Sequence, residues 1–137
     1  MRPQSLPTPL NVALSRALRK FTASAFNVML IEGVTYPADS LTLTVLVFFV
    51  YSYGTDLLFG RCPGMMLAGS AWRGNPTWRQ KLTYCVSYTL SFALLFVSPL
   101  SAGAIALTQA AAVLTTGKTT HGWLANMDSA PMASTLS

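Results

Sequence analysis

Residues 41–59 read LTLTVLVFFVYSYGTDLLF, and this stretch decides the class of fold. Its only charged residue is Asp56, which lies one helical turn before the stretch ends. A helix rises 1.5 Å per residue, so about 20 apolar residues cross the hydrocarbon layer of a bilayer. The stretch therefore predicts a transmembrane helix.

The overall composition agrees with a membrane protein. Apolar residues make up 52% of the 137 residues and charged residues only 9%, whereas soluble domains carry about 25% charged residues. Residues 82–117 contain no charged side chain at all. These figures exclude an ordinary soluble domain and predict one integral membrane domain.

Further apolar segments lie on both sides of residues 41–59. Residues 82–98 form a further span. Residues 21–36 are only about 16 apolar residues and cross if the basic turns before them lie in the headgroups. Pro99, Ser101 and Gly103 interrupt the chain before a shorter apolar segment at 102–116. We therefore predict an all-α integral membrane protein with three transmembrane helices and a fourth, shorter segment that either crosses or is re-entrant.

Three regions follow from this pattern. Residues 1–20 form a basic interfacial lead-in, residues 21–116 form the transmembrane domain with a cytoplasmic loop at 60–81, and residues 117–137 form a polar tail. Gly and Pro punctuate the loop, which predicts tight turns with a short helix or strand. We do not expect a chain of this size to order its tail without a partner.

The basic residues predict the orientation. The lead-in and the loop carry all eight basic residues before position 82, and the two predicted hairpin tips at 37–40 and 98–102 carry none. Positive charge marks the cytoplasmic side, so both termini are expected in the cytoplasm of a bacterial inner membrane. A three-crossing chain would instead place Lys118 outside.

The sequence offers little for catalysis. Cys62 and Cys85 do not have metal-ligand spacing, and His121 is the only histidine. The basic clusters flank hydrophobic segments and lack the aromatic basic face that binds nucleic acid. We therefore expect no enzyme, no cofactor, no metal site and no nucleic-acid partner.

Two motifs resemble those of a known family. Residues 60–69 read GRCPGMMLAG, followed by Gly74, Pro76 and Arg79, and residues 119–125 read TTHGWLA. Together they resemble the RDD family of small bacterial membrane proteins, in which the second helix ends in a G-x-T-P-G-K-x-x-L-G pattern and the domain closes on T-x-H-D-x-L-A. The resemblance covers roughly residues 14–126.

This chain departs from the family pattern at its acids. No acid stands near Phe26 and Asn27, and Gly122 replaces the closing aspartate; Cys62 and Met65 also differ. Some RDD proteins are implicated in ion exchange and others in assemblies associated with lipid importers of the mammalian-cell-entry type. A member without both acids is expected to scaffold a complex, and such an importer is the partner that the resemblance implies.

Two acids lie within predicted spans. We expect Asp56 to form a structural ion pair with Arg16, Arg19 or Arg61 near the cytoplasmic interface, because an unpaired carboxylate in hydrocarbon is costly. Glu32 could equally reach the outer headgroups or meet a partner's basic residue.

The last apolar segment carries small residues at helical spacing. Ala102, Ala106 and Ala110 stand four apart and would let another helix approach closely. We therefore predict a non-catalytic accessory subunit of a larger membrane complex, in contact with integral membrane subunits and the lipid bilayer. The alternative function is a small ion or proton exchanger that acts through Asp56 and Glu32.

Overall fold

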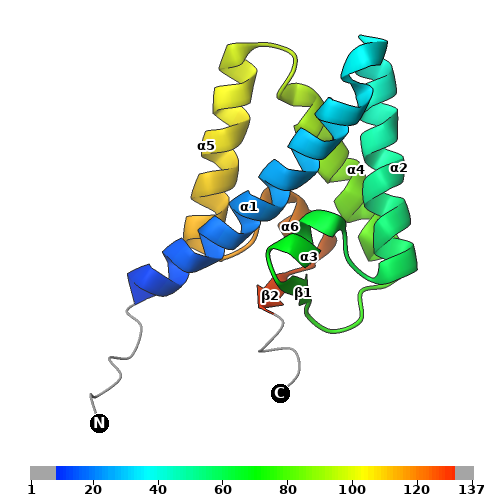
Figure 1. Cartoon of the computed structure of the whole chain (residues 1–137). Coiled ribbons are helices and arrows are strands. Elements are labelled where there is room, and N and C mark those ends of the chain that lie inside the picture. Colours follow the sequence, from blue (N-terminus) through cyan, green and yellow to red (C-terminus); the bar gives the residue numbers. More distant parts are fainter. Residues whose placement is uncertain (1–8, 132–137) are drawn as a thin grey trace.

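The computed structural model describes residues 9–131, which are mostly helical. Two antiparallel helix pairs form the body: α1 with α2, and α4 with α5 (Figure 1). A 3-10 turn at Tyr36–Ala38 connects the first pair. The four bounds are α1 Pro9–Thr35, α2 Leu41–Phe59, α4 Trp78–Leu94 and α5 Pro99–Thr116.

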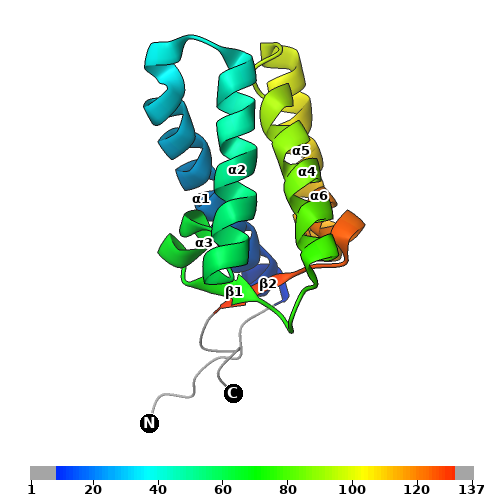
Figure 2. The ribbon, with the colours of Figure 1, turned by 90° about the vertical axis from the view of Figure 1, so that its right-hand side faces the viewer.

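The short elements gather at the end of the bundle opposite the two hairpin turns (Figure 2). They are α3 (Pro63–Leu67), β1 (Ser70–Trp72), α6 (Thr120–Ala125) and β2 (Ser129–Pro131). We call these four elements the cap. The loop predicted at 60–81 thus contains a short helix and a strand as expected, but its last residues already belong to α4.

Helix α2 has the predicted bounds. Ser40 caps its start by accepting a hydrogen bond from the Leu43 amide, and Gly60 ends it in the left-handed conformation at φ 76°. A glycine adopts this conformation without steric cost. Of the described helices, α2 and α5 are the two that are long and apolar enough to cross a membrane.

Helix α5 corrects the prediction of a shorter fourth segment. Pro99 does not interrupt it but is its first residue, a position where proline is well tolerated. Ser98 precedes it as the N-cap and exchanges hydrogen bonds with Ser101 in a capping box. The helix therefore has 18 residues, or about 27 Å of length.

The buried faces of the long helices are unusually polar. In both α1 and α2 the buried positions recur every four residues, and half or more of them are polar: Ala23, Asn27, Ile31 and Thr35 in α1, and Thr44, Phe48, Ser52 and Asp56 in α2. Large apolar side chains point outward instead, such as Leu58 at 79% and Leu100 at 85% exposure. Buried polar groups between the helices are thus combined with many large apolar side chains on the surface, which is unusual in a soluble domain.

An aromatic layer closes the middle of the bundle. Phe48 of α2 is fully buried and stacks on Phe92 of α4 at 4.0 Å between ring centroids. Tyr88 meets Phe48 edge-on at 5.0 Å, and Ile31 of α1 completes the layer. Polar groups lie above and below these four residues, but the layer itself is apolar.

The C-terminal segment corrects the prediction of a tail that needs a partner. Strand β2 pairs antiparallel with β1, with Ala130 opposite Ala71. Lys20 of α1 binds Asp128 at 3.1 Å and the Ser129 hydroxyl at 2.8 Å. Residues 117–131 are therefore held by the chain's own contacts; residues 132–137 lie outside the described part.

The lead-in predicted at 1–20 is likewise no separate region where it is described. From Pro9 onward it is the first part of α1, which continues without a break into the apolar residues after Lys20. Residues 1–8 lie outside the described part.

Candidate functional site

Asn27 is the centre of a buried hydrogen-bond cluster between the helices and the cap. Its side-chain oxygen accepts from the Tyr51 hydroxyl and from the Gly64 amide, each at 2.9 Å. Its side-chain nitrogen lies 3.3 Å from both the Cys62 sulfur and the Tyr88 oxygen. All four hydrogen-bonding capacities of the amide are thereby used within the chain. We call these five residues the Asn27 cluster.

Gly64 allows α3 to pack directly on α1. A Cβ atom at this position would collide with the Ala23 carbonyl oxygen and with the Asn27 side chain. Since the first of these is backbone, it could not move aside like the end of a flexible side chain. The missing Cβ therefore brings the Gly64 amide within reach of Asn27.

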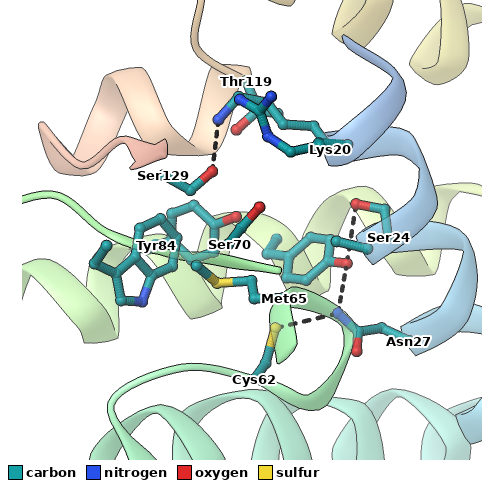
Figure 3. A pocket seen from close by; sticks show the side chains of 13 residues that line it. Lys20, Ser24, Asn27, Cys62, Met65, Ser70, Tyr84, Thr119 and Ser129 are labelled. Carbon is teal, nitrogen blue, oxygen red and sulfur yellow. Dashed lines mark hydrogen bonds between the residues drawn. The ribbon is translucent and has the colours of Figure 1, made fainter. Parts of the chain in front are cut away.

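A cavity of about 30 Å³ lies beside the cluster (Figure 3). It has room for one or two water molecules but not for an organic substrate. Residues from α1, α3, β1, α4 and the C-terminal segment enclose it: Arg19, Lys20, Ala23, Ser24, Asn27, Cys62, Met65, Ser70, Trp72, Tyr84, Tyr88, Thr119 and Ser129. The cavity is thus enclosed where five parts of the chain meet and is not an open cleft.

His121 of α6 is sealed between two tyrosines of α4. Tyr84 meets its ring edge-on at 4.7 Å and Tyr88 stacks on it at 4.8 Å. Neither ring nitrogen has a hydrogen-bond partner among the described residues. Burial, aided by the positive charge of Lys20, lowers the pKa of His121 to about 3. The imidazole is therefore neutral at physiological pH and acts as an aromatic packing group.

Asp56 has different partners from those predicted. Its carboxylate accepts a hydrogen bond from the Trp72 indole at 2.7 Å and a weaker one from the Cys85 thiol at 3.9 Å. The positive charge of Lys81 acts on the Asp56 carboxylate. The Lys81 ammonium group, however, donates its hydrogen bond to the Asp56 backbone carbonyl at 3.1 Å. The predicted ion pair with an arginine is wrong, because an indole from β1 occupies that place.

The three arginines predicted to pair with Asp56 contact other groups. Arg61 donates to the Ser70 carbonyl at 3.0 Å, and Arg19 reaches the Ser15 hydroxyl at 3.5 Å. The Arg16 guanidinium lies against Gly117, which ends α5. A cation is favourable there because helix C-termini carry partial negative charge.

The other predicted site residues are not brought together with the Asn27 cluster. Glu32 is half-buried in α1 and has no hydrogen bond or ion pair within the described residues. On α5, Ala106 and Ala110 are exposed and Ala102 is half-buried. These three alanines lie at the edge of the side of α5 that faces the bundle.

The cluster lacks the parts of a catalytic centre. Burial raises the pKa of the Cys62 thiol, which keeps it protonated and poorly nucleophilic at neutral pH. Within residues 9–131, no three His, Cys, Asp or Glu side chains converge where they could hold a metal ion. What the arrangement does supply is hydrogen bonding between helices, which stabilises bundles inside membranes.

Sequence reasoning missed the central residue of this site. From the sequence, Asn27 stands out only as a position where the RDD family carries an acid, and Trp72 does not stand out. One signal was present: a polar side chain within an apolar span usually faces the bundle interior.

Comparison with known proteins gives no relative. No family model, no curated protein and no solved structure matches the chain.

Proposed function

We propose that this chain is a multi-pass membrane protein with its cap in the cytoplasm. Helices α2 and α5 have the length and hydropathy of membrane spans, and α1 and α4 cross beside them with their basic first turns in the cytoplasmic headgroup region. The many large apolar side chains on the surface and the polar groups buried between the helices support this proposal, since lipid favours an apolar exterior. The distribution of charge supports it too. The structure describes eight basic residues, which lie in the first half of α1, in the cap and its loops, or at the start of α4. The turn at Tyr36–Ala38 has none, and positive charge marks the cytoplasmic side.

Cysteine labelling tests the orientation. Ala38 at a hairpin tip and Asn75 beside the cap are both exposed. We expect a membrane-impermeant maleimide to label Ala38→Cys in intact cells and Asn75→Cys only after permeabilisation. The parent chain is the control, because Cys62 and Cys85 are buried. The reverse pattern would invert the proposed topology.

Within the membrane, we propose that the chain is an accessory subunit that binds a larger integral membrane protein through α5. One observation carries this proposal: of the 18 residues of α5, only Val113 is buried. The helix stands at the edge of the bundle (Figure 1). Small residues at its surface suit close contact with another helix, where packing rather than hydrophobicity drives association.

A bulky substitution at this surface tests the docking proposal. Ala106→Trp is expected to reduce recovery of the partner at least several-fold, because the indole would separate two closely packed helices. Ala111→Trp is the matched control: it is also exposed on α5 but lies about 140° around the helix. The measurement is mass spectrometry of material purified in mild detergent, alongside the thermal stability of each variant.

Equal recovery of the partner with both variants would remove the Ala102–Ala106–Ala110 face from the interface. Purification of a homogeneous homo-oligomer without another subunit would contradict the accessory role and favour the ion-exchanger alternative.

The exchanger alternative has less structural support. The hydrogen bond between Thr35 and Thr44 aligns α1 with α2, and this places Glu32 about 13 Å along the axis from Asp56. The aromatic layer around Phe48 lies between the two levels. The two acids therefore belong to separate environments, with no shared site for a cation.

The type of complex is proposed from the RDD resemblance alone. On that basis the partner is a transporter, and a lipid importer of the mammalian-cell-entry type is the first one to examine. The hydrogen-bonded amide of Asn27, where the family carries an acid, agrees with a structural role at that position.

A further inference from the structure

A groove of about 310 Å³ opens on the outside of the bundle where α2 ends and α4 begins. It lies next to β1, because Ala71 and Trp72 of that strand line it. Its volume is in the range of small-molecule sites, and it is separate from the cavity beside Asn27. The lining residues are Phe59, Gly60, Arg61, Ala71, Trp72, Gly74, Asn75, Pro76 and Lys81.

Two cations and no acid line this groove. Arg61 donates one hydrogen bond to the Ser70 carbonyl, and Lys81 donates one to the Asp56 carbonyl. These bonds fix both side chains but leave most of their N–H donors available. In the described part of the chain, both ion pairs involve Asp128, so neither Arg61 nor Lys81 is paired with a carboxylate.

Asp56 is the acid nearest to the groove, but it does not line it. Its carboxylate is 2% exposed and is bound by the Trp72 indole and the Cys85 thiol. The groove therefore presents positive charge to the outside, while the negative charge that accompanies it is enclosed in the bundle.

An apolar surface adjoins the cationic groove. Leu57, Leu58 and Phe59, the last three residues of α2, are 48%, 79% and 66% exposed. In the proposed orientation they face the hydrocarbon just above the cytoplasmic headgroups. A cationic groove at headgroup level beneath an apolar surface matches the two ends of one phospholipid molecule.

We propose that this groove binds the phosphate of an anionic phospholipid, with Arg61 and Lys81 as its ligands and the acyl chains along the end of α2. The proposal rests on the proposed membrane crossing of α2, but not on the accessory role. Arg61 offers a planar fork of donors to two phosphate oxygens and Lys81 offers a point charge.

The test compares phosphatidylglycerol binding to purified protein in phosphatidylcholine nanodiscs by native mass spectrometry. The double variant Arg61→Gln/Lys81→Gln removes both charges while keeping side-chain N–H donors for the Ser70 and Asp56 carbonyls. Its affinity is expected to fall roughly thirty-fold, since each basic residue near a membrane surface contributes about a five-fold effect. The charge-preserving pair Arg61→Lys/Lys81→Arg is expected to retain most of the affinity.

Arg79→Gln/Lys118→Gln is the matched control. It lowers the net charge equally at residues that do not line the groove; Arg79 lies over the Trp78 ring instead. This control is expected to keep most of the affinity. Equal loss in both double variants would overturn the proposal, because it would show attraction to net charge without a site.

Inorganic phosphate distinguishes the two sources of a phosphate group. Millimolar phosphate is expected to leave phosphatidylglycerol bound; displacement would assign the groove to a free phosphate and overturn the lipid proposal. Release of the chain from membranes by alkaline carbonate would overturn the membrane location together with this site. If no partner co-purifies with the parent chain while phosphatidylglycerol still binds, only the accessory role is overturned.

Discussion

Replacing Asn27 with alanine is expected to lower the free energy of unfolding by about 3 to 5 kcal/mol. The substitution removes the acceptor for the Tyr51 hydroxyl and the Gly64 amide. It leaves the buried Gly64 amide and the part-buried Tyr51 hydroxyl without a partner. Each unsatisfied buried donor costs about 1–3 kcal/mol. Cys62 and Tyr88 also lose the hydrogen bonds that the Asn27 amide nitrogen donates to them.

Reversible unfolding of the purified protein in mixed detergent micelles measures this effect. Met29→Ala is the control on the same helix, because Met29 is 74% exposed and a substitution there is expected to change stability little. A loss no larger than that of Met29→Ala would show that the cluster does not hold α3 against α1.

Acid is expected to destabilise the protein through His121. The folded state keeps this imidazole neutral, with a pKa of about 3, whereas the unfolded chain protonates it below the ordinary value of about 6.5. The stability that the neutral ring contributes is complete above pH 6.5 and is lost as the pH falls toward 3. The slope is about 1.4 kcal/mol per pH unit, or about 2 kcal/mol between pH 6.5 and 5.

His121→Phe separates this contribution from those of other groups. Phenylalanine keeps the ring contacts with Tyr84 and Tyr88 but cannot take up a proton. Unfolding curves recorded between pH 5 and 7 are expected to shift with pH in the parent and to coincide in the variant. Lys20 and its partner Asp128 lie nearby, and the same slope in both proteins would assign the acid sensitivity to groups such as these.

Helix α2 could be predicted from sequence because its determinants are local. Its apolar composition, the Ser40 cap and the Gly60 stop all lie within or next to it. Helix α5 was predicted too short, since Pro99 was interpreted as an interruption although proline is favoured at the first helical position. The resolving signal was Ser98 with Ser101, a capping pair three residues apart.

The site depends on contacts that no local pattern encodes. Asn27 binds groups that lie 24 to 61 residues away along the sequence. Asp56 was expected beside an arginine because charge complementarity was the only partner rule that sequence offered. In the structure the Asp56 carboxylate instead accepts a hydrogen bond from the Trp72 indole, which belongs to β1.

The pairing of β1 with β2 also determines the order in which the chain can be completed during synthesis. Residues 129–131 are synthesised after every residue of both helix hairpins, so β1 exists well before its partner strand. The contact between Lys20 and Asp128 joins residues 108 positions apart and forms in the same last step. Helix formation and closure of the strand pair are therefore separate events, and a chain that has not closed still presents an unpaired strand edge, the kind of surface that promotes pairing with other chains.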